Sequence, residues 1–229
     1  MVLSGITSVV TATPASLAGV SVGTSGWSYP SWKPGFYPAG TKSEDFLRHY
    51  AEHFQTVELN TTGYRLPREE LFARWAEQTP PAFEFTPKLN AHARAAYGAF
   101  AERVALLGDR LGPIRAVVAS ARDEGLLALV LGSFDASTRL AFDFRHDSWD
   151  GIERELPPNA VRVGSLEGAA PFRYLRFRDP PYDDAALESL AAPVRPLLAD
   201  GLRVYCYFRH EDEPTAPYYA RRFLQLLAR

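Results

Sequence analysis

The sequence predicts an α/β fold of the TIM-barrel type, with eight mainly parallel strands and helices between most of them. Three observations lead to this prediction. Short apolar runs typical of buried strands recur along the 229 residues, helical patterns separate most of these runs, and the length suits one barrel domain. A doubly wound open sheet is the competing topology, but GTSGWSYP after the first strand does not fit the GxGxxG phosphate turn.

Each element follows from a local pattern. The expected strands are Val20–Thr24, Thr56–Asn60, Phe83–Lys88, Arg115–Ser120, Leu140–Phe144, Ala160–Gly164, Arg173–Arg178 and Arg203–Phe208. The expected helices are Ser43–His53, Pro67–Glu77, Ala95–Leu111, Asp123–Leu131, Asp183–Leu198 and Pro217–Leu227. Ser43 is expected to cap the first helix, and Pro67 to occupy the first position of the second, where its missing N–H is harmless.

The connections and the start of the chain set the expected domain boundaries. Residues 145–159 leave room for only a stub of helix and residues 165–172 leave room for none, so the helices after strands 5 and 6 are expected to be shortened or missing. Residues 1–19 are apolar and rich in small residues but lack the basic segment of a secretory signal, so we expect a loose N-terminal extension. Residues 20–229 are expected to form a single TIM-like barrel domain.

Charge and cysteine content narrow the class of partner. The net charge is −2, so the field of the whole molecule favours neither nucleic acid nor a membrane, although nucleic acid is left open. No stretch approaches the ~18 apolar residues of a membrane span, and a cytoplasmic location is expected by default. The single cysteine, Cys206, rules out an intrachain disulfide, and its apolar run VYCYF predicts a small buried thiol.

The stretch TVELN, residues 56–60, places a carboxylate inside an expected buried strand. Alternation sets Glu58 and Asn60 opposite Val57 and Leu59. In a barrel the apolar row packs against the outer helices, so the polar row is expected to point into the lumen. The same rule applied to the other strands sends these ionisable groups inward: Glu58, Glu84, Lys88, Asp143, Arg145 and Arg176, with several tyrosines, Tyr207 among them.

Such inward charges need partners, because an unpaired buried charge is costly. They are expected to pair with one another, with water or with a ligand. A salt-bridged, hydrated lumen without chemistry is the alternative interpretation, and for Glu58 and Glu84 it carries about equal weight.

The carboxyl ends of the strands are the expected place of a site, as in other barrels. The polar side chains expected at or near this rim are Asn60, Arg65, Lys88, Arg145, His146, Arg176, Arg178, Arg209 and His210. A locally basic rim suits a phosphate or carboxylate group, since arginine offers bidentate donors to either. Trp27, Tyr29 and Tyr64 are expected to line the pocket, whereas loop packing is favoured for Trp32 and Trp149.

Several stretches resemble one known family. GTSGWSYPSWKPGFYP, YAEHFQTVELNTTGYRLP and FDFRHDSW, in this order, look like the YecE-like family, the domain-of-unknown-function family numbered seventy-two, and YLRFR and YCYFRH fall where that family has two more signature strands. The resemblance covers roughly residues 22–228 and implies a TIM-barrel-like fold with no established activity.

The chain departs from the pattern of that family at three places and therefore resembles a divergent member with an altered ligand. Arg178 and Asp179 stand where the family usually has His-Gly, and Arg209 and His210 stand where it has Asn-Asn. VVASARDEG stands where the family has a Gln followed by prolines.

The expected function is acid–base chemistry, of hydrolase, lyase or isomerase type, on a small anionic or phosphate-bearing substrate. Glu58 or Asp143 is the candidate general base, and His146 the candidate proton donor or acceptor. Lys88 and the arginines are candidates for stabilising negative charge. The competing interpretation makes Arg145 an ion-pair partner of Glu58 and His146 a cap of its loop.

Two other functions stay open. One is a non-catalytic barrel that binds an anionic ligand, and the other is a metal-dependent phosphodiesterase or nuclease in which His92, His146 and His210 converge. No cofactor is expected, with a divalent metal as a weak alternative. His49 and His53 have a metal-binding spacing on a helix, but a solvated or packing role is favoured because no third ligand is evident from the sequence.

Overall fold

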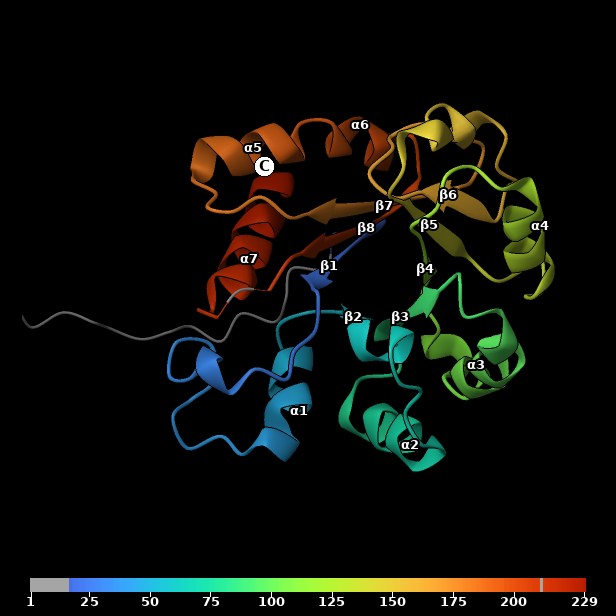
Figure 1. The fold of residues 1–229 in the computed structure, drawn as a ribbon. Helices are drawn as coiled ribbons and strands as arrows, with labels where there is room; N and C mark the ends of the chain where they lie inside the picture. Colours follow the sequence, from blue (N-terminus) through green and yellow to red (C-terminus); the bar gives the residue numbers. More distant parts are fainter. Residues whose placement is uncertain (1–16, 211) are drawn as a thin grey trace, which may run out of the picture.

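The computed structural model describes residues 17–210 and 212–229 and places the strands at the centre with the helices outside (Figure 1). The expected extension, residues 1–19, lies almost entirely outside the described residues. The strands are β1 (Val20–Thr24), β2 (Thr56–Leu59), β3 (Glu84–Asn90), β4 (Ile114–Val118), β5 (Leu140–Phe144), β6 (Ala160–Arg162), β7 (Phe172–Phe177) and β8 (Arg203–Phe208). All the predicted strands are present, with ends displaced by two residues at most.

The strands are parallel, but they form two sheets rather than one. The first sheet has the order β1-β8-β7, and the second has the order β2-β3-β4-β5-β6. Within the described residues, no backbone ladder joins β1 to β2 or β6 to β7. The structure therefore confirms a parallel α/β fold, whereas the closed eight-stranded cylinder expected from the sequence is not what the hydrogen bonding shows.

Local features explain why no backbone ladder forms at the two junctions between the sheets, β6 with β7 and β1 with β2. Strand β6 has only three residues, and Gly164, with φ of 88°, follows it and donates one backbone hydrogen bond of 2.9 Å to Tyr174 of β7. At the other junction a Cβ on Gly23 would lie 2.1 Å from the carbonyl oxygen of Thr56, so the two backbones are in contact. There the hydroxyl of Tyr50 accepts from the backbone of β1 at 2.8 Å and donates to the carbonyl of Thr56 at 3.1 Å.

The helices are α1 (Phe46–Ala51), α2 (Glu69–Gln78), α3 (Tyr97–Ala105), α4 (Glu124–Gly132), α5 (Asp184–Ala191), α6 (Val194–Ala199) and α7 (Thr215–Leu227). Four of the six predicted helices are shorter or divided, whereas α4 has the expected length and α7 begins two residues earlier than expected. Ser43 is not a helix cap but begins a 3-10 turn, and Pro67 lies two residues before α2. The single helix expected over Asp183–Leu198 is divided near Pro193, which has no N–H to continue the hydrogen-bond ladder.

The connections after β5 and β6 are short, as expected. Two 3-10 turns, Asp147–Trp149 and Ile152–Arg154, stand in place of a helix after β5. The described residues contain no helix between β6 and β7. The corresponding side of the molecule is therefore covered by loops.

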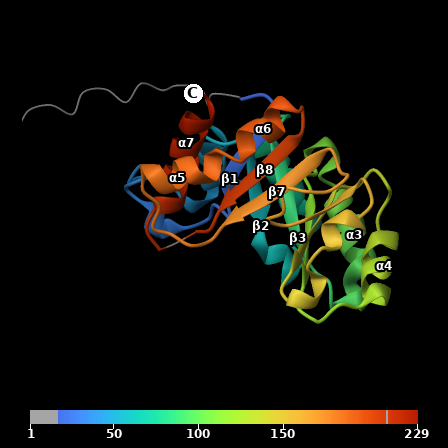
Figure 2. The ribbon, with the colours of Figure 1, turned by 90° about the horizontal axis from the view of Figure 1, so that it is seen from above.

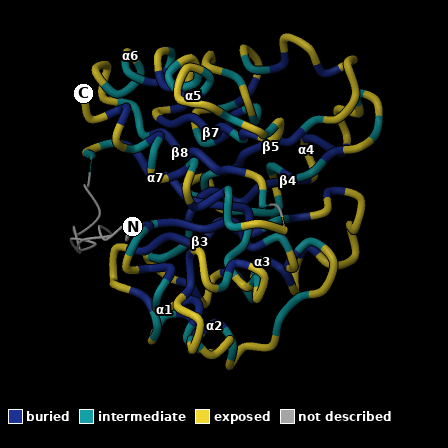
Figure 3. Tube along the Cα trace, turned by 90° about the vertical axis from the view of Figure 1, so that its left-hand side faces the viewer, coloured by how far each residue is buried: buried dark blue, intermediate teal, exposed yellow. Residues whose placement is uncertain are grey.

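Apolar helix faces cover the outside of both sheets. Helix α7 buries Ala216, Ala220, Phe223 and Leu227 at helical spacing, in one cluster with Cys206 of β8. Figure 2 shows α5, α6 and α7 on the side of β7 and β8, and α3 and α4 on the opposite side of the molecule. The strands are the buried part of the trace (Figure 3). None of the described helices is long and apolar enough to cross a membrane.

Candidate functional site

Glu58, the carboxylate inside β2, is 1% exposed and fully paired. The Tyr174 hydroxyl donates a 2.6 Å hydrogen bond to its Oε1. Arg176 donates from Nε and Nη2 to its Oε2, at 3.2 and 3.0 Å. Because Tyr174 and Arg176 come from β7, these contacts join the two sheets across the interior, and the polar row of β2 does point inward.

Arg115 of β4 lies at the centre of the network, with 3% of its side chain exposed. Its Nη1 donates to Asp143 Oδ2 at 2.7 Å, and its Nη2 donates to Asn60 Oδ1 at 2.8 Å. Its Nε lies 3.1 Å from Glu58 Oε1, an ion-pair contact without hydrogen-bond geometry. One guanidinium therefore bridges the two carboxylates that the sequence singles out as candidate bases.

Asp143 is held by two further arginines. Arg145 Nη2 donates to Asp143 Oδ2 at 2.6 Å, and Arg176 Nη1 lies 3.7 Å from the same oxygen. Arg145 was expected to pair with Glu58. It pairs instead with Asp143, which lies two residues before it at the end of β5. Three guanidinium groups share two carboxylates, and the network carries an excess of positive charge.

The environment of Glu58 keeps its carboxylate ionised. Burial by itself raises the pKa of Glu58, but the charges of Arg115 and Arg176, together with hydrogen bonds from Tyr174 and Arg176, hold that pKa below its usual range. A carboxylate of low pKa accepts a proton poorly. Glu58 is therefore well suited to orient arginines and poorly suited to act as a general base.

Glu84 belongs to a separate network at the amino end of the strands. Arg139 Nη2 and Arg203 Nη2 donate to its carboxylate at 2.8 and 2.6 Å, and the Tyr205 hydroxyl donates at 3.0 Å. The Glu84 side chain itself is 9% exposed, whereas Arg139 and Arg203 reach it from partly exposed positions. For Glu84 the geometry matches the salt-bridged interpretation.

Arg178 and Arg209 add positive charge at the carboxyl end. They follow the paired residues Phe177 and Phe208, and Arg209 N donates to the Phe177 carbonyl at 2.9 Å. In the part of the chain that the structure describes, neither side chain forms an ion pair with a carboxylate. Burial lowers the pKa of Arg178, and the nearby charges of Arg145 and Arg176 lower it further. Positive charge is therefore in excess over the two carboxylates at this end of the strands.

His210 also lies at the carboxyl end of the strands, where it follows β8 and contacts Tyr29 and Ser25. Its ring stacks on Tyr29, with centroids 4.5 Å apart and planes 12° apart, and its backbone N–H donates to Ser25 Oγ at 3.1 Å. Burial lowers the pKa of His210, and the charge of Arg209 adds to this effect, while Asp212 opposes it. The imidazole is therefore neutral at pH 7 and half-buried beside the network.

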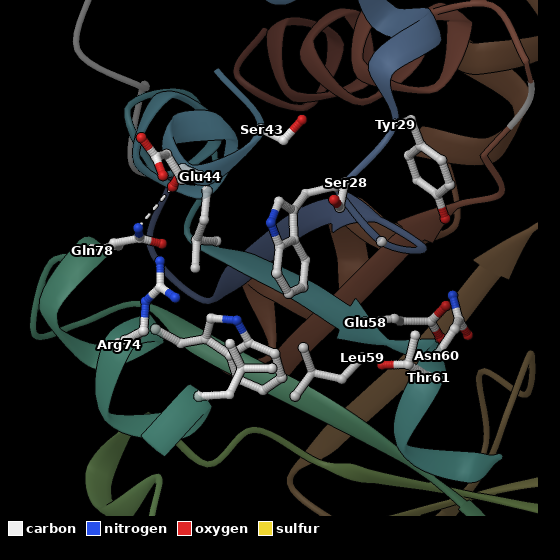
Figure 4. A pocket seen from close by; sticks show the side chains of 15 residues that line it. Ser28, Tyr29, Ser43, Glu44, Glu58, Leu59, Asn60, Thr61, Arg74 and Gln78 are labelled. Atoms are coloured by element: carbon white, nitrogen blue, oxygen red, sulfur yellow. Dashed lines mark hydrogen bonds between the residues drawn. The ribbon is translucent and has the colours of Figure 1, made fainter. Parts of the chain in front are cut away.

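A cavity of about 390 Å³ opens next to Glu58. Figure 4 shows Glu58, Asn60 and Thr61 at one end and Arg74 and Gln78 at the other. Its apolar wall includes two indoles in edge-to-face contact, with centroids 5.5 Å apart, and two leucines: Trp27, Trp75, Leu47 and Leu71. The cavity joins an apolar chamber to one edge of the ionic network, and it brings together four of the predicted residues: Trp27, Tyr29, Glu58 and Asn60.

Lys88, Tyr64 and Arg65 lie apart from the two carboxylates. Lys88 Nζ sits 3.9 Å above the ring centroid of Tyr64, which is 83% exposed. No described carboxylate lies within ion-pair distance of Lys88. Arg65 lines a second, more open cavity of about 720 Å³, which shares Thr61 and residues of α2 with the first. Lys88 is therefore not paired with Glu58 or Asp143, and its amine packs instead on Tyr64, which follows the turn after β2.

The histidines predicted to converge on a metal are engaged separately. His146 Nδ1 accepts from Ser148 N at 3.1 Å, which caps the turn Asp147–Trp149, as the competing interpretation of FRH expected. His92 Nε2 accepts from Ala119 N at 3.0 Å. Among the described residues, no group of three metal-ligating side chains forms at this end. The geometry thus gives the metal-dependent nuclease hypothesis no support.

Two residues of the network, Arg115 and Tyr174, are absent from the candidates chosen from the sequence. Arg115 is a single charge in the apolar run IRAVV, the same signal that singled out Glu58, so alternation along β4 would have found it.

Tyr207 was a candidate from the sequence and lies deeper in the molecule: its hydroxyl is 2.6 Å from Thr56 Oγ1 and 2.7 Å from Thr86 Oγ1. Tyr207 is fully buried and links β8 to β2 and β3, so its hydroxyl is not exposed to a ligand.

Comparison with known proteins gives a consistent result. A family profile described as "Protein of unknown function DUF72" matches residues 21–157, more than half of the chain. The UPF0759 protein YecE from two Escherichia coli strains is 42% identical over 72 residues. That match spans 31% of this chain and only 24% of YecE.

Solved structures resemble this chain over nearly its whole length. The crystal structure at 3.10 Å of a DUF72 family protein from Enterococcus faecalis matches with a TM-score of 0.74 and 16% identity, covering 92% of this chain and 96% of the other. A DUF72 family protein from Thermotoga maritima matches with a TM-score of 0.71 and 22% identity, covering 92% and 99%. At these identities the likeness concerns the fold alone.

Proposed function

Since the chain belongs to the DUF72 family, a family of unknown function, its activity has to be argued from the site, and we propose that it binds a small phosphate- or carboxylate-bearing molecule at the carboxyl ends of its strands. The observation that carries this proposal is the excess of guanidinium groups. Arg115, Arg145 and Arg176 share two carboxylates, and Arg178 and Arg209 add two charges without an ion-pair partner in the described residues.

Crowded guanidinium groups favour a bound anion. The lowered pKa of Arg178 has burial as its first cause and neighbouring arginines as the second, so a negative group placed between these side chains would relieve the repulsion. Arginine presents paired N–H donors that match phosphate or carboxylate oxygens. The buried carboxylates support the same function, because they hold Arg115 and Arg176 in fixed positions.

The cavity beside Glu58 supplies room for the rest of such a ligand. Its wall of Trp27, Trp75 and Leu71 suits an apolar or ring-shaped body, and Asn60 and Glu58 stand where this wall meets the ionic network. A molecule with an acidic group and a ring would use both parts.

The test is anion binding by the intact chain. Titration calorimetry with inorganic phosphate, pyrophosphate and citrate is expected to detect binding that weakens as salt rises. The double variant Arg178→Ala/Arg209→Ala is expected to lose at least about tenfold in affinity, since charge-assisted hydrogen bonds contribute about 1.5–3 kcal/mol each. The control Arg48→Ala/Arg154→Ala removes the same charge from exposed positions and is expected to bind like the parent. Equal losses in both double variants would show a nonspecific charge effect and overturn the proposal.

A second candidate function is acid–base catalysis on the bound anion, favoured by His210. It is a neutral imidazole beside the arginine cluster, whereas Glu58 and Asp143 are occupied by ion pairs. A panel of phosphate esters and sugar phosphates tests for turnover. If His210 is the base, His210→Asn lowers kcat about 10²–10⁴-fold and removes the acid limb of the pH profile. Anion binding without turnover of any panel member would leave a binding protein.

We also infer that the two sheets together close one barrel around this interior. The support is the set of contacts across both junctions: Tyr50 between β1 and β2, the Gly164–Tyr174 hydrogen bond between β6 and β7, and the Glu58–Arg176 pair inside. Closure would place all strand ends on one rim and would make the arginine cluster its centre.

A further inference from the structure

Three side chains with metal-binding groups gather at the end of α1, on the outside of the molecule. His49, Glu52 and His53 are spaced i, i+3 and i+4, and their donor atoms all lie within 4.8 Å of one another. His49 Nδ1 is 3.7 Å from Glu52 Oε2, and the two imidazole centroids are 4.8 Å apart. The sequence suggested a histidine pair without a third ligand, and the fold supplies that ligand in Glu52.

The orientation of His49 is fixed by a backbone group. Its Nε2 lies 3.0 Å from the carbonyl oxygen of Phe36, which can only accept a hydrogen bond, so Nε2 carries a proton. In the neutral ring the lone pair is then on Nδ1, and it faces the carboxylate of Glu52. A metal cation placed between these two acceptors would be attracted by both. An imidazole that donates its other N–H to a carbonyl is also the usual arrangement around a bound metal.

The surroundings restrain the imidazole rings of His49 and His53 and leave the three side chains accessible to an ion from solvent. The ring of Phe36 contacts His49 and His53, with centroids 5.4 Å away in each case. Glu52 is exposed, and the two histidines are partly buried. Arg221 lies near His53 and opposes a cation by its charge, whereas Glu52 attracts one. An ion would enter from solvent and meet donors that are already held together.

We propose that His49, Glu52 and His53 form a binding site for a divalent transition metal, with Zn²⁺ as the best-suited ion. Two imidazoles and one carboxylate match the nitrogen and oxygen donors that zinc prefers, and a fourth position stays open to water. His53 lies beside Val20 at the start of β1, so this site is at the opposite end of the strands from the arginine cluster. The ion would fasten α1 to the loop that carries Phe36, and it has no part in the proposed anion binding.

The test is metal binding by the full chain after treatment with a chelator. Titration with Zn²⁺ is expected to give one equivalent bound and a higher Tm, and Co²⁺ is expected to give the visible absorption of a nitrogen–oxygen site. His49→Ala and His53→Ala are expected to weaken binding at least about tenfold, and the control His92→Ala, at an exposed histidine elsewhere, is expected to leave it unchanged.

Glu52→Gln separates metal binding from folding, because the Glu52 side chain is 63% exposed and the amide keeps its size. This variant is expected to keep the parent far-UV circular dichroism and Tm without metal, and to lose most of the Tm increase with Zn²⁺. Absence of stoichiometric binding, or equal binding by His53→Ala, Glu52→Gln and His92→Ala, overturns the proposal.

Discussion

Arg115 of the central strand β4 and Glu58 of the edge strand β2 form a buried ion pair, with 3.1 Å from Nε to Oε1 and at most 3% of either side chain exposed. The same guanidinium donates to Asp143 and Asn60. Removing one member of a buried ionic network leaves charges without compensation, which destabilises a protein far more than loss of an exposed pair.

Arg115→Met is therefore expected to lower the free energy of unfolding by about 3–5 kcal/mol, because Glu58 and Asp143 keep their charges with one guanidinium fewer. Urea denaturation measures this change. The control Arg154→Ala, whose side chain is 77% exposed, is expected to change stability by less than about 1 kcal/mol. A loss from Arg115→Met as small as that of the control would mean that water compensates the carboxylates.

The lowered pKa of Glu58 predicts a dependence of stability on pH. Its folded pKa lies below the unfolded value of 4.5, so the unfolded chain binds the proton more readily. The resulting stabilisation is complete above pH 4.5 and is lost as the pH falls through the folded pKa. Denaturation of the parent is expected to show a steeper loss of stability as the pH falls below about 5 than that of Glu58→Gln.

The matched control for this pH experiment is Glu167→Gln, which changes an exposed carboxylate in the same way. Its profile is expected to follow the parent. If Glu58→Gln instead keeps the slope of the parent, the proton taken up on unfolding belongs to another group, and the paired state of Glu58 is wrong.

The junction between the sheets offers a separate test. In Tyr50→Phe the buried backbone N–H of Thr24 loses the hydroxyl that accepts from it at 2.8 Å. The variant is expected to lose about 1–3 kcal/mol of stability, and the Thr24 amide is expected to exchange with solvent faster than its neighbours in β1. Tyr218→Phe removes an exposed hydroxyl bonded to Gly35 and serves as the control. Unchanged exchange at Thr24 would argue against Tyr50 as the link between β1 and β2.

Alternation along single strands predicted the interior charges well. Glu58, Asp143 and Arg176 point inward because their strand neighbours are apolar and pack against helices, which is a local property of each strand. Arg115 obeys the same rule and is equally visible in the sequence. The buried half of the site is thus readable from the alternation within β2, β4, β5 and β7.

What the sequence did not predict depends on contacts between distant segments. At the junction of β1 and β2, the hydroxyl of Tyr50 from α1 stands between the two backbones, and the alternation within the strands does not predict this contact. Lys88 has the alternation of an inward residue, but its amine lies 3.9 Å from the ring centroid of Tyr64, which belongs to the connection between β2 and α2. The cavity wall formed by Trp75 depends in the same way on where α2 docks.

The Tyr207 hydroxyl provides the last prediction, since it joins β8 to β2 and β3 and so spans both sheets. Thr56 Oγ1 donates to the Glu84 carbonyl at 2.9 Å and can therefore only accept from Tyr207, so the hydroxyl of Thr86 is the one that donates to Tyr207. Tyr207→Phe leaves the buried Thr86 hydroxyl without an acceptor and is expected to lower the free energy of unfolding by about 1–3 kcal/mol. The double variant Tyr207→Phe/Thr86→Val removes both partners and is expected to recover much of that loss in urea denaturation, because no orphaned donor remains. If the two substitutions are simply additive, the hydroxyls do not bond to each other and the sheets are held together by other contacts.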